Sequence, residues 1–223
     1  MAKGVIVEFD FAAMNGAELL FDTTKSFLQR LDGIPFDERV EAQRMAGYNY
    51  QGAFAEYFPI VKTKKTAAKA AKDLTAAFAS ALEDEIPKCG VTQGFRNFVK
   101  ALASRGVKVV IATRANITSA GIATTFAPLL GENVVLYHEE STTYGSVKWD
   151  VWRRACAANG LKPVFTLAVT GSGNGVKSAL VAGLPSMVVI SARTAYQDCS
   201  GADAIVRELN ADAAKEALSI LRA

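Results

Sequence analysis

Two carboxylates, Glu8 and Asp10, follow the first apolar run of the chain, Val5-Ile-Val7. Because alternate side chains of an extended chain point to the same side, we expect Glu8 and Asp10 to lie on one side of the backbone. At the end of a strand, such a pair could flank a metal ion or a reacting phosphorus atom. Acidic residues that merely follow a strand at the protein surface are the alternative interpretation.

Polar residues also follow two later apolar runs. Thr113 and Arg114 come after Val109-Val-Ile-Ala112, and the Thr113 hydroxyl could bind an anion or cap the next turn. Arg114 could supply the positive charge that a metal ion would otherwise provide, or it could be a solvated surface arginine. The segment Gly171-Ser172-Gly-Asn-Gly175 presents backbone N–H groups at the expected start of a helix, where an anion can bind.

These positions form one site only if a parallel sheet brings them together. Short β-branched runs alternate with segments of helical periodicity, which predicts an α/β fold with a doubly wound, mostly parallel, Rossmann-like sheet. In such a sheet, ligands bind at the carboxyl ends of the strands, near the point where the strand order reverses. The expected strands are residues 5–7, 107–112, 133–137, 164–169, 186–190 and 203–206.

Residues 16–86 interrupt this alternation. Leu20, Phe27 and Leu28 share a helical face, and the alanine-rich segment 66–81 lacks strand signals. We therefore expect an all-helical cap domain at 16–86, inserted into an α/β core domain of residues 1–15 plus 87–223. Gly and Pro at both junctions would allow the cap to move over the strand ends, whereas a cap that never moves agrees equally well with the sequence.

Composition narrows the classes of partner. The chain of 223 residues has a formal net charge of +3, and half of it is hydrophobic. So small a surplus argues against nucleic acid as a partner. The three cysteines are far apart in the sequence, which favours reduced thiols over a disulfide framework or a zinc site. No apolar run is long enough for a signal peptide or a membrane span, so we expect a soluble, cytoplasmic protein; the oligomeric state is not indicated.

Three further features have structural interpretations. The spacing G-x-G-x-G at 171–175 differs from the G-x-G-x-x-G of dinucleotide-binding loops, so neither NAD nor FAD is expected. The lysine-rich run 62–72 is typical of a solvated helix face, with binding to an acidic partner as the alternative. The single histidine, His138, has no second histidine with which to build a metal or catalytic cluster.

The order of these motifs resembles the haloacid dehalogenase-like hydrolase superfamily, in its helical-cap branch of phosphoglycolate phosphatases and β-phosphoglucomutase-like enzymes. The resemblance covers nearly the whole chain. The acidic first strand, the inserted cap, the strand ending at Thr113 and the segment Gly145-Ser-Val-Lys148 are similar to successive features of that family. The segment 169–183, with its trailing Ala-Gly, is similar to the family's fourth motif.

The resemblance implies covalent phosphoryl transfer. In that chemistry the first acid of the strand attacks phosphorus, and Asp10 would act as general acid and base. Thr113 and Lys148 would hold phosphate oxygens, while acids of the fourth motif would complete a Mg²⁺ site.

The sequence departs from this pattern at three positions. Glu8 stands where the family has an aspartate, and Thr170 and Gly171 stand where it has acids. The longer side chain misplaces the carboxylate, and a misplacement of about 1 Å can lower a rate ~100-fold. We therefore expect no metal ion or other cofactor, lost or weak phosphatase activity, and binding of a small anionic or phosphorylated molecule or of a partner protein. Lys148 would then pair with Glu8 or Asp10. A working Mg²⁺-dependent phosphatase or phosphomutase, acting on a small phosphate ester, is the alternative.

Overall fold

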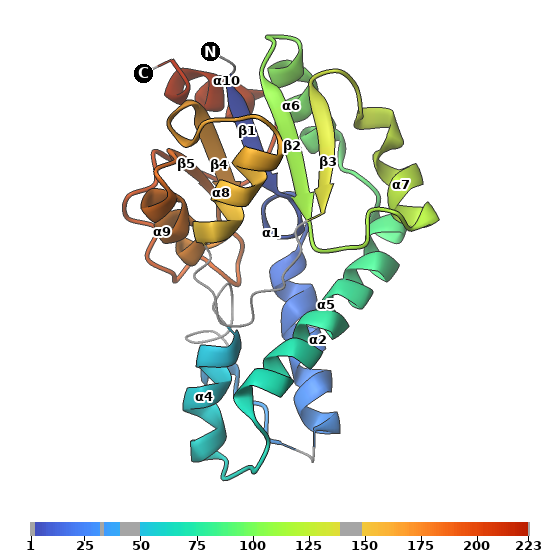
Figure 1. Cartoon of the computed structure of the whole chain (residues 1–223), viewed down its shortest axis with the longest axis vertical. Coiled ribbons are helices and arrows are strands. Elements are labelled where there is room, and N and C mark those ends of the chain that lie inside the picture. The colour runs from blue at the N-terminus through green and yellow to red at the C-terminus, as the bar shows by residue number, and fades with distance from the viewer. Residues whose placement is uncertain (1–2, 32–33, 41–49, 139–148, 223) are drawn as a thin grey trace.

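The computed structural model describes residues 3–31, 34–40, 50–138 and 149–222. Within them, six strands form one sheet in the order β3-β2-β1-β4-β5-β6 (Figure 1). Every strand pairing is parallel, which confirms the predicted doubly wound fold. The strands are β1 (Gly4–Glu8), β2 (Lys108–Thr113), β3 (Val134–His138), β4 (Thr166–Thr170), β5 (Ser186–Val189) and β6 (Ala204–Val206).

Helices cover both faces of the sheet because successive strand residues point to opposite sides. Val5 and Val7 pack with α6 (Gln93–Ala103), α7 (Ala120–Phe126) and α10 (Ala211–Ile220) on one face. Ile6 points the other way and packs with α8 (Trp149–Ala158) and α9 (Gly173–Ala182). A sheet buried on both faces explains why its strands read as continuous apolar runs rather than alternating ones.

A group of helices between β1 and β2 extends away from the sheet, towards the lower part of Figure 1. It consists of α2 (Gly16–Arg30), α3 (Glu38–Val40), α4 (Tyr50–Ile60) and α5 (Ala67–Cys89). Phe54 and Leu74 are fully buried there, in a hydrophobic cluster separate from the two beside the sheet. The predicted junction at residue 16 coincides with the start of α2, but the one at 86/87 falls inside α5, which continues to Cys89. Gly90, with φ of 64°, ends that helix in the left-handed region that favours glycine.

Three expected strands are shorter than the apolar runs that predicted them; one of these, β5, ends at Val189 rather than at 190. The run 164–169 loses its beginning because Pro163–Phe165 form a 3-10 turn, after which β4 starts at Thr166. The last strand starts at Ala204 rather than at 203. A second 3-10 turn, Ala127–Leu129, follows α7.

An arginine of the sheet domain holds the first helix of the insertion. Arg193, in the segment after β5, donates two hydrogen bonds to the Glu18 carboxylate of α2, at 2.8 and 2.7 Å. Its guanidinium also lies over the Phe21 ring, 3.6 Å from the ring centre. Both side chains of this Arg193–Glu18 pair are partly exposed, at 32% and 41%, so the pair is screened by solvent.

Candidate functional site

The carboxyl ends of three neighbouring strands bring polar side chains together. Glu8 is the last residue of β1, Thr113 the last of β2 and Thr170 the last of β4. All three are buried, although each carries a polar side chain. The chain adds β2 and β3 on one side of β1 and β4 to β6 on the other, so these residues lie at the reversal of strand order, where ligands bind in open α/β sheets.

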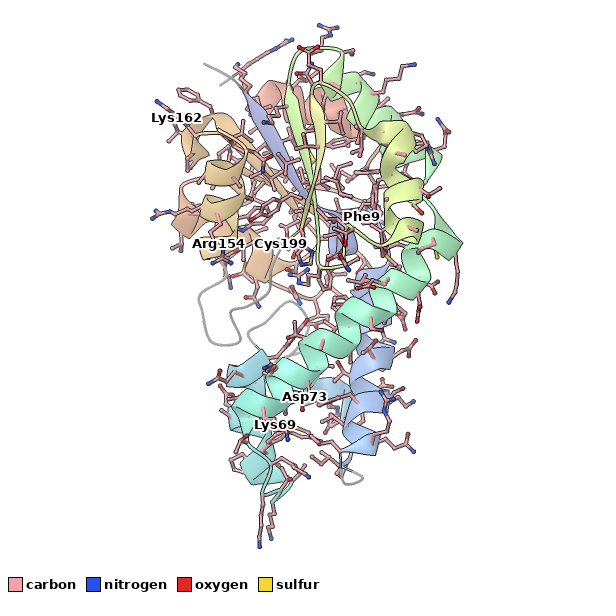
Figure 2. All side chains as sticks on the ribbon, turned by 45° about the vertical axis from the view of Figure 1, so that its right-hand side comes forward. Phe9, Lys69, Asp73, Arg154, Lys162 and Cys199 are labelled. Carbon is pink, nitrogen blue, oxygen red and sulfur yellow. The ribbon has the colours of Figure 1, made fainter. Side chains whose placement is uncertain are left out.

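Glu8 and Asp10 do not share a side of an extended chain, so the alternation expected from the sequence is wrong. The backbone leaves the strand after Glu8 and forms the one-turn helix α1 (Phe9–Ala12), which contains Asp10. Phe9 holds this turn by packing edge-on against Phe95 and Phe126, with ring centres 5.4 and 4.8 Å away. Figure 2 shows Phe9 beside the lower part of the sheet, above the inserted helices.

Arg114 brings the two carboxylates into one cluster. Its Nη2 lies 3.2 Å from Oε1 of Glu8, and its Nη1 lies 3.2 Å from Oδ2 of Asp10. The side chain is only 10% exposed, and its guanidinium lies 5.3 Å from the centre of the Phe11 ring. The interpretation of Arg114 as a solvated surface arginine is therefore wrong: it places positive charge between the two acids.

Hydroxyl and backbone donors engage the remaining carboxylate oxygens. Thr170 donates to Oε2 of Glu8 at 2.5 Å, and Thr113 donates to Oδ1 of Asp10 at 2.6 Å. The backbone N–H of Arg114 also donates to Oδ2 of Asp10, at 2.9 Å. Every oxygen of both carboxylates thus has a hydrogen-bond donor. We call Glu8, Asp10, Thr113, Arg114 and Thr170 the carboxylate–arginine cluster.

Burial has a marked effect on the acid–base chemistry of Asp10. Loss of solvation raises the pKa of its carboxyl group above the usual range, because the charged form is excluded from water. The Arg114 charge and the hydrogen bonds from Thr113 and Arg114 act in the opposite direction, and the Glu8 charge adds to the increase. A carboxyl group with a raised pKa keeps its proton to a higher pH than an ordinary aspartate does, which is a property that general acids use.

The glycine-rich segment packs closely and caps itself. A Cβ on Gly171 would stand 2.3 Å from the Phe11 carbonyl oxygen, so no side chain fits there without a shift of α1. Ser172 is the N-cap of α9 and accepts from the Gly175 N–H at 3.0 Å, while Gln197 accepts from the Gly173 N–H at 2.8 Å. Two of the N–H groups that we expected to hold an anion are therefore already hydrogen-bonded.

This donor set does not fit a divalent cation. The two carboxylates are bridged by a guanidinium, and their oxygens are engaged by donors that a cation would have to displace. In the part of the chain that the structure describes, no group of three or more His, Cys, Asp or Glu side chains could hold a metal ion. Mg²⁺ demands near-ideal octahedral geometry and free oxygen ligands, which this arrangement does not offer.

The other residues singled out in the sequence lie in varied surroundings. Lys148 is outside the described residues. His138 has Nδ1 2.9 Å from the Ala115 carbonyl oxygen, which supports the turn after β2. The lysines of the run 62–72 are exposed, as expected for a solvated face.

Sequence reasoning treated Thr170 only as a missing acid and overlooked it as a partner of Glu8. The signal that could have found it is strand register: Val7 pairs with Val169, so the next residues of β1 and β4 are Glu8 and Thr170. That register is set by the packed sheet and cannot be read from either run alone.

Comparison with solved structures identifies the fold. The chain superimposes on β-phosphoglucomutase from Clostridium difficile with a TM-score of 0.71 and 13% identity, over 100% of this chain and 98% of that one. A predicted phosphatase from Clostridium acetobutylicum gives a TM-score of 0.69 at 19% identity, over 98% and 100%. CbbY from Rhodobacter sphaeroides, solved in complex with phosphate, gives a TM-score of 0.62 at 16% identity, over 94% of this chain and 95% of that one.

At these identities the comparisons show the fold alone. No protein family model matches the sequence, and no curated protein matches it either. Within the described residues, no helix combines the length and the apolar character needed to cross a membrane.

Proposed function

Because this chain has the helical-cap fold of haloacid dehalogenase-like hydrolases, we propose that it is a divergent protein of that type, with lost or weak phosphatase activity, that binds a small anionic molecule. A phosphorylated compound is the class of ligand that the phosphate complex of CbbY favours. A partner protein at the same edge of the sheet is the other occupant compatible with the sequence.

One observation carries this proposal: Arg114 lies between Glu8 and Asp10, 3.2 Å from each. A carboxylate that attacks phosphorus must be free to approach it. Positive charge must also offset the repulsion between the carboxylate and the phosphate, which are both negative. In this protein both acids are already paired with the guanidinium and with two threonine hydroxyls. A phosphate group that enters must compete for Arg114 with two buried carboxylates, and no described side chain replaces the missing metal ligands.

Arg114 also supports the binding of an anion. A guanidinium presents a planar fork of donors that matches phosphate geometry, and the Thr113 hydroxyl lies beside it on the same cluster. Because the Arg114 guanidinium already pairs with Glu8 and Asp10, we expect weak binding of inorganic phosphate rather than tight binding.

Two measurements on the intact protein test the proposal. Inorganic phosphate, added at constant ionic strength with chloride as the reference, should shift the amide signals of residues 8–10 and 113–115. Arg114→Gln should remove that response, whereas Arg105→Gln, at an exposed position, should keep it. Hydrolysis of p-nitrophenyl phosphate should not depend on Mg²⁺. Absence of any shift at these residues, or Mg²⁺-dependent turnover that Glu8→Ala abolishes, would contradict the proposal.

The raised pKa of Asp10 favours a second candidate, a working hydrolase of small phosphate esters. A carboxyl group with a raised pKa keeps its proton to a higher pH than an ordinary aspartate does, and general acid–base catalysis uses such a group to protonate a leaving group and later activate water. This function requires turnover that Asp10→Asn lowers by about 100-fold or more. Equal turnover in Asp10→Asn and in the unaltered protein would rule it out.

A further inference from the structure

A large cavity lies next to the two connections between the sheet domain and the inserted helices. It measures about 790 Å³ and is bounded by the α1–α2 junction, the end of α5, the start of α6 and the residues that follow β5 and β6. Its lining includes neither Glu8, Asp10 nor Arg114, so it is distinct from the carboxylate–arginine cluster. Cavities of roughly 300–1,000 Å³ are the usual size for sites that enclose a small organic molecule.

The inner wall of the cavity is apolar. Phe11, Phe95, Val189 and Leu209 are buried residues that line it, and Leu19 adds a partly buried side chain from α2. These side chains come from four separate parts of the chain and belong to, or pack against, the main hydrophobic cluster of the sheet domain. A ligand in this cavity would therefore place an apolar body against a preformed wall, where removal of apolar surface from water favours binding.

Most charged residues in the lining of the cavity are acids. Glu18, Asp22, Glu85 and Glu208 line it, whereas Arg207 is the one lining residue with a positive charge among those that the structure describes. Glu18 is paired with Arg193, and Glu85 lies 3.8 Å from the exposed Lys88 ammonium and accepts a hydrogen bond from the Cys89 thiol. These two acids are therefore partly offset by cations outside the lining, and the offset of Glu85 is weakened by solvent. Carboxylates that converge on one opening create a negative potential that attracts cations and repels anions.

From this combination we propose that the cavity binds a small organic amine with an apolar body. The ammonium group would lie among Asp22, Glu85 and Glu208, and the hydrocarbon part would lie against Phe11 and Leu19. Charge complementarity distinguishes this ligand class from the anion assigned to the carboxylate–arginine cluster. The two sites therefore take ligands of opposite charge.

A series of ligands that differ only in charge tests this proposal. 4-Phenylbutylamine, 4-phenylbutan-1-ol and 4-phenylbutanoate share one apolar body and are cationic, neutral and anionic at neutral pH. In titrations followed by amide signals, the amine should shift residues 11–19 and 89–95 at concentrations about fivefold or more below those needed for the alcohol, as expected for one added ion pair of modest strength. The carboxylate should bind least. Failure of the amine to bind, or equal or stronger binding of the carboxylate, would overturn the proposal.

A pair of matched double variants locates the charge effect. Asp22→Asn with Glu85→Gln removes two carboxylates from the rim and should weaken amine binding by about three- to tenfold, while binding of the alcohol stays unchanged. Asp73→Asn with Asp84→Asn removes the same formal charge from exposed positions on α5 that do not line the cavity. Asp73 lies on the part of α5 far from the sheet (Figure 2).

The control pair should bind the amine as the unaltered protein does. Equal weakening in both double variants would show a general effect of net charge and would contradict a site in the cavity.

Discussion

The carboxylate–arginine cluster and the cavity next to the α1–α2 junction share the turn α1, but their acids differ in burial and in hydrogen bonding. In the cluster, Glu8 and Asp10 are almost fully buried, and a guanidinium and two hydroxyls satisfy every carboxylate oxygen. In the cavity, Asp22 and Glu208 are exposed around an open apolar wall. At the edge of the sheet where a catalytic site is expected, the two acids are therefore paired within the protein, whereas Asp22 and Glu208 of the cavity are open to solvent.

Removal of the guanidinium should have the largest effect. Arg114→Met leaves two buried carboxylates without their cation, so we expect a loss of about 3–5 kcal/mol in the free energy of unfolding. Arg105→Met, at an exposed position, should change stability by less than about 0.5 kcal/mol. Urea denaturation of both variants measures the difference. Adding Glu8→Gln and Asp10→Asn to Arg114→Met should recover part of the loss; an Arg114→Met protein of unchanged stability would mean that the cluster does not depend on this cation.

A side chain at residue 171 should have the next largest effect. Gly171→Ala places a methyl group 2.3 Å from the Phe11 carbonyl oxygen and 2.5 Å from its carbon, and backbone atoms cannot rotate away. We expect a loss of about 3 kcal/mol, the upper part of the range for overpacked sites. Gly131→Ala is the control, because a Cβ there would meet nothing within 4 Å. Similar melting temperatures for the two variants would show that α1 can shift at little cost.

Loss of one hydroxyl should have an intermediate effect. Thr170→Val keeps the shape of the side chain but removes the donor to Oε2 of Glu8, and hydrogen bonds to charged groups contribute about 2 kcal/mol. Thr125→Val removes an exposed hydroxyl that bonds to its own helix, and water can replace that bond. Equal stability of these two variants in urea would show that Glu8 gains nothing from Thr170.

The Arg193–Glu18 pair should give the smallest effect, and it should depend on pH. Hydrogen bonds from Arg193 lower the pKa of the Glu18 carboxyl below its ordinary value of 4.5, so the folded state favours the charged form. The stabilisation is therefore complete above pH 4.5 and is lost as the pH falls through the lowered pKa. An exposed pair of this kind contributes up to about 1 kcal/mol.

Amide hydrogen exchange of residues 191–197 measures this contribution. Exchange in the unaltered protein should become faster, relative to Glu18→Gln, as the pH falls below 4.5. Glu216→Gln, at an exposed position on α10, is the matched control and should follow the unaltered protein. Identical exchange in Glu18→Gln and the unaltered protein at neutral pH would mean that the pair does not hold this segment.

The sheet could be predicted from the sequence because its strands carry their signal locally. A run such as 107–112 is apolar and β-branched over its whole length, and burial on both faces requires that composition. Helix α6 was equally visible, since Phe95, Phe98, Val99 and Leu102 repeat at helical spacing and all four are buried. The helical insertion was visible by contrast, as a long segment without strand signals.

The arrangement of the candidate site could be predicted only in part. The residue types at 8, 10, 113 and 114 indicated that charge would gather at one edge of the sheet. The turn at Phe9 could not be read from the sequence, because it depends on aromatic partners at positions 95 and 126. The role of Arg114 was equally hidden, since a lone arginine after a strand is usually solvated, and only the packed structure excludes water from it.

The contact between Gly171 and the Phe11 carbonyl also limits which sequences can be reached from this one. An aspartate at 171, like any residue other than glycine, would need a Cβ in space that the backbone of α1 already occupies. A metal-binding acid therefore cannot be acquired there by one substitution in the present backbone. An acid at 171 would require a change in the backbone of the turn 9–12. Until that change occurs, evolution cannot add a metal ligand at this position.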